Sequence, residues 1–178
     1  MFVGLSYIQV IDYLSIMKKI LAACLVLVAL AACKKDPTLA DRLEGSWLVN
    51  DIIASGQISF GGQNIPLVAN DKEIAATSVF TLVQEPNSVT YAVDATLSVS
   101  AGTSLDVPWA QSGSGTWLTI DGGGASPDSV HLVGTDGTIT KYEVLSLLDA
   151  SVRLRTKQIV DFQGQGVDMT IEFGFAKQ

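Results

Sequence analysis

The residue with the most reactive side chain, Cys33, stands at the end of the motif Leu30-Ala31-Ala32-Cys33. The motif closes an apolar run that begins at Ile20, and the basic pair Lys18-Lys19 precedes this run. A basic start, an apolar middle and small residues before a break are the parts of a secretory signal peptide. The segment therefore predicts export of the chain, and it places a thiol directly after the small residues.

The residues Leu30-Ala31-Ala32-Cys33 resemble the lipobox of bacterial lipoproteins, in which the cysteine thiol is diacylated and the chain is then cut just before it. The resemblance implies that Ala32 is the last residue removed and that Cys33 is the first residue kept. It also implies that acyl chains on Cys33 hold the protein on a membrane. Two or more chains give a stable anchor, whereas one chain gives marginal binding.

The alternative for this segment is an uncleaved transmembrane helix. A span needs about 20 apolar residues, but Ile20–Ala32 has 13 residues and charged residues follow at 34–36. Met17 and the lysines after it would open a signal peptide of ordinary length. We interpret the chain as an upstream extension that is not translated in the cell (1–16), a lipoprotein signal peptide (17–32), a lipidated cysteine with a flexible tether (33–42) and one domain (43–178).

Removal of residues 1–32 leaves 146 residues, enough for one domain with a sizeable core. Nine of them are basic and seventeen are acidic, without a lysine and arginine cluster. This balance argues against binding to nucleic acid and to anionic lipid heads. Because Cys24 leaves with the signal peptide and Cys33 is acylated, no thiol remains for a disulfide, a metal or catalysis.

Alternation of apolar and polar residues dominates the rest of the sequence. It is clearest at 88–100, where apolar side chains from Val89 to Val99 share one face, and at 167–175. Such alternation predicts antiparallel strands with one buried face. Weaker strands are expected at 45–53, 74–84, 114–120, 129–133, 138–145 and 151–160, and one short helical turn at 39–43. Turn signals separate them, at Glu85-Pro86-Asn87, Asp121-Gly122-Gly123-Gly124 and Thr135-Asp136-Gly137.

About eight strands in meandering order predict an all-β domain, either an antiparallel up-and-down barrel or a two-sheet β-sandwich. Gly45-Ser46-Trp47 opens the first strand, and Ser114-Gly115-Thr116-Trp117 opens a later one. These motifs, with the order of turns and strands after them, are similar to the lipocalin-like domains of Bacteroidota lipoproteins. The resemblance covers roughly residues 43–178 and implies a barrel whose first tryptophan packs across the closed end. It also implies a late arginine over that tryptophan, a role for Arg153 or Arg155.

An eight-stranded barrel has an interior just wide enough for side chains or for one small ligand. Since the apolar faces point inward, such a ligand would be apolar or partly so. Five large side chains are candidates to line the ligand site: Trp47, Tyr91, Trp117, Met169 and Phe173. The alternative is that these side chains only fill the core.

Side chains suited to catalysis are few. His131 is the only histidine, and neither a cysteine nor an identifiable acid accompanies it, which makes a poor triad or metal site. Asp121, Asp128 and Asp136 lie near turns, at spacings that match no known calcium loop. We therefore expect a protein that is not an enzyme and binds no metal or cofactor. A hydrolase that uses paired carboxylates is the least favoured alternative.

Three cationic residues, Arg153, Arg155 and Lys157, alternate along one expected strand and share a face. We interpret this face as solvated, with charges that discourage strand-to-strand aggregation. Val152 and Leu154 between them are the better core candidates. The alternative is an anion or partner site, if this face pointed inward.

Two functions follow from these expectations. The first is a lipid-anchored carrier or scavenger of a small apolar ligand. The second is a non-enzymatic interaction module of an envelope complex, with a filled barrel and with the stretches Gly56–Asn70 and Ala101–Gly113 as contact loops for an unknown protein partner. Residue 34 is lysine rather than the aspartate that retains enterobacterial lipoproteins at the inner membrane. We expect attachment to the outer membrane, on its periplasmic face or at the cell surface.

Overall fold

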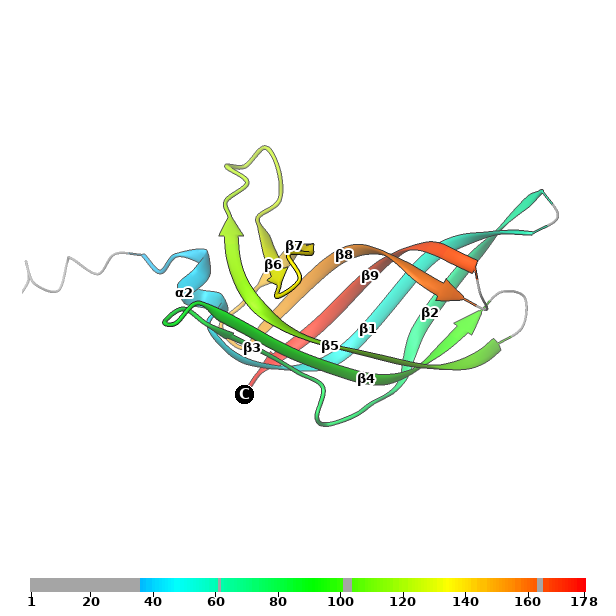
Figure 1. Ribbon diagram of the computed structural model, residues 1–178, viewed down its shortest axis with the longest axis horizontal. Helices are drawn as coiled ribbons and strands as arrows, with labels where there is room; N and C mark the ends of the chain where they lie inside the picture. Colours follow the sequence, from blue (N-terminus) through cyan, green and yellow to red (C-terminus); the bar gives the residue numbers. More distant parts are fainter. Residues whose placement is uncertain (1–35, 61, 101–103, 163–164) are drawn as a thin grey trace, which may run out of the picture. The chain divides into compact units, whose positions relative to one another are not determined.

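A meander of antiparallel strands forms almost all of the folded chain. The computed structural model describes residues 36–60, 62–100, 104–162 and 165–178 (Figure 1). The predicted signal peptide, its cleavage after Ala32 and the lipid attachment at Cys33 lie outside the described residues. Pro37–Gln178 forms one compact unit with its own hydrophobic core.

The described elements follow the expected order closely. They are α2 (Leu39–Leu43), β1 (Gly45–Phe60), β2 (Gln63–Ile74), β3 (Val79–Val83), β4 (Ser88–Ser100), β5 (Ser104–Ile120), β6 (Ser129–Gly134), β7 (Ile139–Leu147), β8 (Ser151–Phe162) and β9 (Gln165–Lys177). The three predicted turn signals lie between β3 and β4, between β5 and β6, and between β6 and β7.

The strands form a single sheet that closes on itself. Each strand from β3 to β8 pairs with the next, and β1 pairs with β9 to complete the ring. β2 and β3 together occupy one position, because β1 and β4 each pair with both of them. Nine strands thus fill eight positions around the wall, which confirms the prediction of an up-and-down barrel of about eight strands rather than a two-sheet sandwich.

Two stretches that we expected as contact loops are strands. Residues 56–60 and 62–70 of the stretch Gly56–Asn70 form most of the β1–β2 hairpin, and residues 104–113 of the stretch Ala101–Gly113 belong to β5. Their alternation was hidden by proline, glycine and serine, which normally mark loops. Pro66 and Pro108 each lie where the strand pairs on one side only, which is where a sheet admits proline.

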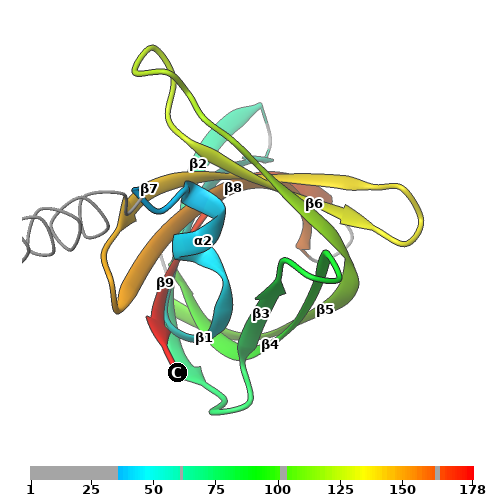
Figure 2. The same cartoon turned by 90° about the vertical axis from the view of Figure 1, so that its left-hand side faces the viewer.

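The short helix α2 covers one end of the barrel (Figure 2). A capping box starts it, in which the Thr38 hydroxyl accepts from Asp41 N and the Asp41 carboxylate accepts from Thr38 N. Leu43 is fully buried, and Arg42 donates to the Leu147 carbonyl. The predicted tether, 33–42, therefore gives way to the domain at Thr38 rather than at residue 43.

Trp47 packs across this closed end, where its indole N–H donates to the Leu43 carbonyl at 2.7 Å. The cation over its ring is Lys177, whose Nζ lies 5.1 Å from the ring centroid. Neither Arg153 nor Arg155 takes this role, because both lie on outward positions of β8 and pair there with acidic residues. The expectation of an arginine over Trp47 was wrong.

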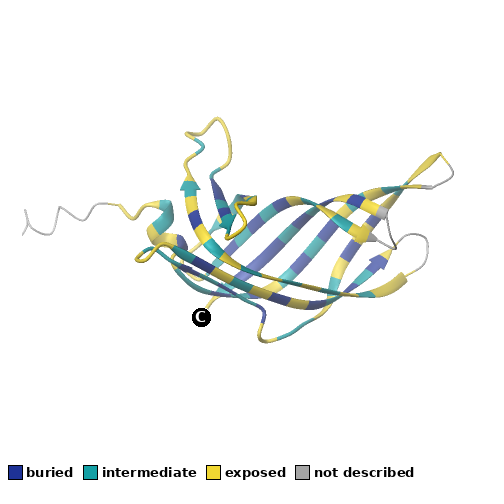
Figure 3. Cartoon of the chain, in the orientation of Figure 1, coloured by how far each residue is buried: buried dark blue, intermediate teal, exposed yellow. Residues whose placement is uncertain are grey.

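Aromatic side chains fill the half of the barrel next to α2. Phe80 stacks on Tyr91 at 5.0 Å between ring centroids, and it meets Phe175 edge-on at 5.1 Å. Tyr142 and Phe173 complete the cluster. Buried positions alternate with exposed ones along the strands (Figure 3). In the described part of the chain, no helix is long and apolar enough to cross a membrane.

Burial raises the pKa of the Tyr142 hydroxyl well above its ordinary value of about 10. Above about pH 10, the unfolded chain releases the proton of this hydroxyl and the folded state keeps it. The free energy of unfolding should therefore fall as the pH rises above about 10, by up to about 1.4 kcal/mol per pH unit. We expect Tyr142→Phe to remove this part of the slope. Urea unfolding between about pH 9 and pH 11 tests it, and equal slopes in both proteins would contradict it.

Candidate functional site

The barrel wall is incomplete around the tip of the β8–β9 hairpin. β7 pairs with β8 only as far as Glu143 and Arg155, and β6 pairs with β5 only from Gly115 onward. Residues 104–114 of β5 and 156–162 of β8 therefore face each other without a ladder, and we call this boundary the seam. On the other side of the tip, the β1–β9 ladder ends at Gly56 and Met169. Among the described residues of this tip, 156–162 and 165–168, the backbone pairs only within the hairpin itself.

An apolar cavity of about 100 Å³ lies inside this half of the barrel, against the seam. Ala54 and Ala69 leave room because their side chains are short, whereas the aromatic half has large side chains at the corresponding inward positions. The cavity is lined by Ala54, Leu67, Ala69, Leu97, Val99, Val107, Pro108, Trp109, Val160, Asp161, Val167, Met169 and Ile171. Its walls come from both strands that border the seam.

Side chains close the seam where the backbone does not. The Gln111 amide on β5 donates to the Gln158 carbonyl oxygen on β8 at 2.8 Å. Trp109 stacks on Phe173 with ring centroids 5.8 Å apart. Thr156 is the inward residue of β8 that comes before Gln158, and it is 3% exposed. Its hydroxyl has no hydrogen-bond partner among the described residues. A polar strip therefore adjoins the apolar cavity.

Of the five side chains predicted to line a ligand site, Met169 lines this cavity. Trp47, Trp117 and Phe173 are buried in the packed half, where the Trp117 indole donates to the Val83 carbonyl at 2.9 Å. Tyr91 stacks on Phe80 and borders a separate cleft beside the β6–β7 turn. The structure does not bring the five together around one space.

Sequence reasoning missed the side chains that contribute most to the seam. Val107, Trp109 and Gln111 are inward positions of β5, and Val160 is an inward position of β8. Their alternation with outward residues was a usable signal. It was overlooked because the stretch before Ser114 was interpreted as a loop.

The candidate catalytic and metal-binding residues serve local structure. Asp121 and Asp128 accept from the backbone of Gly123 and Gly122 in the β5–β6 loop. Hydrogen bonds from Thr138 hold the pKa of Asp136 below its usual value. His131 lies on β6 with Nε2 3.3 Å from the Ser129 hydroxyl. In the described ranges, no group of three or more His, Cys, Asp and Glu side chains could hold a metal ion.

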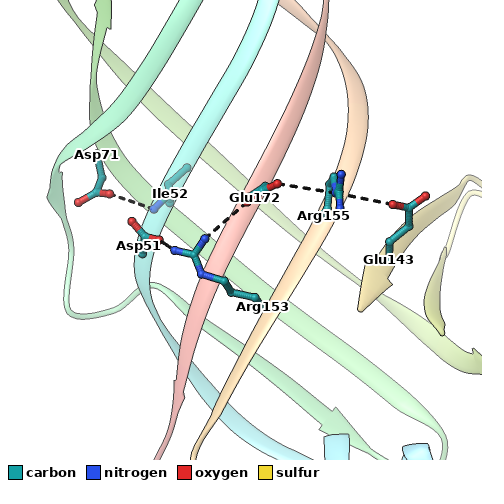
Figure 4. Close-up of polar contacts among 7 residues, drawn as sticks. All are labelled: Asp51, Ile52, Asp71, Glu143, Arg153, Arg155 and Glu172. Atoms are coloured by element: carbon teal, nitrogen blue, oxygen red, sulfur yellow. Dashed lines mark hydrogen bonds and ion pairs between the residues drawn. The ribbon is translucent and has the colours of Figure 1, made fainter. Parts of the chain in front are cut away.

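Two of the three cations of β8, Arg153 and Arg155, belong to an ion-pair chain on the outer face (Figure 4). Arg153 pairs with Asp51 and Glu172. Arg155 lies between Glu143 and Glu172, at 3.6 and 3.7 Å. The prediction of a solvated face for these residues is confirmed, since Val152 and Leu154 between them are buried.

No protein-family model matches the chain, and no curated protein matches it in sequence. The functional argument therefore rests on the cavity, the seam and the residues around them.

The Gln111–Gln158 pair gives a test of how the seam is closed. Gln111→Leu leaves the half-buried Gln158 amide unpaired, and we expect a loss of about 1 kcal/mol in the free energy of unfolding. The double variant Gln111→Leu/Gln158→Leu should regain most of this loss, because no amide is then left unsatisfied. Urea denaturation measures both. Additive losses in the double variant would show that the two amides are not coupled.

Proposed function

We propose that this protein is a lipid-anchored lipoprotein of the bacterial outer membrane, whose β-barrel binds a small apolar ligand. The observation that carries the binding function is the apolar cavity behind the seam. Its lining is aliphatic and aromatic, with few polar groups, which is the usual composition of a small-molecule site. The surrounding polar strip could fix the orientation of a ligand.

The size of the cavity sets how a ligand could enter. Pockets for drug-sized molecules are typically about 300–1,000 Å³, and this cavity has about 100 Å³. A ligand longer than a few carbon atoms would need the seam to open. The hairpin tip is suited to this movement, because its described residues pair with no other strand beyond Arg155 and Met169. Outward motion of the tip would widen the cavity without breaking a backbone ladder.

The membrane anchor is supported by the sequence of the first 36 residues alone. The lipobox-like motif and the short apolar run before it favour cleavage after Ala32 and acylation of Cys33. Residue 34 favours the outer membrane, on either face. The folded domain begins at Thr38, so only a few residues would separate the lipid from α2. Five residues, 33–37, reach about 18 Å at most when fully extended.

A second function is an interaction module of an envelope complex. The packed aromatic half favours it, since aromatic rings in contact occupy that part of the interior. Large apolar side chains are also exposed on the outside, among them Ile139 at 62%, Leu148 at 65% and Ile159 at 74%. They are scattered over β7, the β7–β8 turn and β8, and single exposed apolar side chains are common on soluble proteins. The cavity therefore makes ligand binding the first choice.

Replacement of Cys33 tests the anchor. We expect Cys33→Ser to lose incorporation of a fatty-acid label and to move the protein from the membrane fraction to the soluble fraction, because the thiol that carries the acyl chains is gone. Cys24→Ser is the matched control, since Cys24 would leave with the signal peptide. Retention of Cys33→Ser in the membrane fraction would contradict the proposed anchor.

A bulky side chain in the cavity tests ligand binding. Val160→Phe should occupy the cavity and reduce the affinity for decanol by roughly tenfold or more, as measured by calorimetry on residues 34–178. Ile159→Phe is the control, because the neighbouring side chain points outward and is 74% exposed. Thermal unfolding of both variants shows whether they fold. Unchanged affinity in a folded Val160→Phe variant would place the ligand elsewhere.

A further inference from the structure

A second opening lies beside the seam, where β7 and β8 separate beyond Glu143 and Arg155. The resulting cleft has a volume of about 330 Å³. We call it the β7–β8 cleft, and it is lined by Ile139, Thr140, Lys141, Glu143, Arg155, Thr156, Lys157 and Gln158. The cleft and the apolar cavity both use β8, at consecutive parts of the strand.

The lining of the β7–β8 cleft comes from both faces of the barrel wall. Thr140, Thr156 and Gln158 fall in the inward series of their strands, in step with the buried Tyr142 and Leu154. The four charged residues of the lining fall in the outward series. Because both series line one space, the inner end of the cleft carries hydroxyl and amide groups and its outer mouth carries charges.

The outer mouth has an excess of positive charge. Arg155 is matched by Glu143 and Glu172. Lys141 and Lys157 have no acidic partner within ion-pair distance among the described residues. Two ammonium groups that make no ion pair among the described residues therefore lie at one opening, with Asp168 beside Lys157 in the neighbouring cleft. They would attract a small anion to this mouth.

The inner end of the cleft has a donor with nothing to bind. Thr156 is 3% exposed, and its hydroxyl has no partner in the described residues. Burying a hydroxyl without a hydrogen bond destabilises the fold. An acceptor oxygen placed between this hydroxyl and the two lysines would satisfy all three groups.

The inward positions of β8 lead from the Thr156 hydroxyl to the apolar cavity. Thr156, Gln158 and Val160 follow one another at intervals of two residues, so about 13 Å separates the hydroxyl from the cavity wall. Gln158 and its partner Gln111 lie between them. A linear molecule with one charged end would match this sequence of charge, polar strip and apolar cavity.

We propose that the ligand is an unbranched acyl chain with an anionic carboxylate head. The head lies in the β7–β8 cleft, where Lys141 and Lys157 neutralise it and the Thr156 hydroxyl donates to it. The chain runs along the seam past Gln111 and Gln158, and its end occupies the apolar cavity. This inference rests on the proposed ligand-binding function and names the chemical class of the ligand.

Decanoate and decanol, which differ only in the head group, test the inference by calorimetry on residues 34–178. We expect Lys141→Gln and Lys157→Gln each to weaken decanoate binding about threefold and the pair to weaken it about tenfold, since a partly exposed ion pair contributes modestly. Decanol binding should not change. Lys72→Gln is the charge-matched control, because Lys72 lies on β2 and pairs with Asp106, outside the cleft.

Thr156→Val provides a second readout that does not depend on surface charge. It removes the hydroxyl and keeps the shape of the side chain, so the stability of the free protein should be retained or increased while decanoate binding weakens. If both molecules bind and all these variants bind decanoate as the unmodified domain does, the carboxylate site is wrong and the apolar ligand function stands. If neither molecule binds, both proposals are wrong.

Discussion

The backbone ladder between β1 and β9 is the interaction on which the rest of the structure depends. Without it the meander would be an open sheet with two free edges, and the apolar stripes of its inner face would lie in water. With it, the first and last strands of the domain become neighbours, and every inward side chain faces another. The ladder is complete at the end covered by α2 and stops at Gly56. The barrel therefore has one closed half and one half that is only partly closed.

The two halves differ in what fills them, and composition explains the difference. Phe80, Tyr142 and Phe173 meet in the closed half, where their rings pack against one another. Alanine stands at inward positions 54 and 69 in the other half, where the cavity lies. The same half has the strand segments without lateral partners. Room for a ligand and freedom of the wall to move thus occur together, as a site that must admit its ligand requires.

Much of the fold could be predicted from the sequence because period-two alternation survives wherever outward residues are polar and inward residues are apolar. Strand 88–100 was predicted with its observed bounds, and so was the helix at 39–43. The β1–β2 hairpin and the first half of β5 were missed, since Gly56, Pro66 and Pro108 suggested loops. Pro66 and Pro108 are compatible with strands here because each strand is an edge at that point, and an edge is a property of the tertiary arrangement. Gly56 is instead paired on both sides, with Leu67 and Met169, which only the closed barrel brings to it.

The candidate site was harder to predict because it, too, depends on the tertiary arrangement. Large inward side chains looked like the natural lining of a ligand site, but Trp47, Trp117 and Phe173 fill the closed half. A cavity arises where side chains are small, and small residues carry no signal of their own in a sequence. The pairing of Gln111 with Gln158 joins residues that are 47 positions apart and follows only from the closure of the barrel.

The central claim is that the partly closed half of the barrel holds an apolar ligand. Native mass spectrometry of residues 34–178, purified gently from a bacterial periplasm, tests it most directly. The account predicts a reproducible added mass that extraction with organic solvent removes, and the identity of that mass would give the ligand. A bare protein mass that also gains nothing after incubation with decanol and decanoate would contradict the claim, and the barrel would then be a filled scaffold for a protein partner.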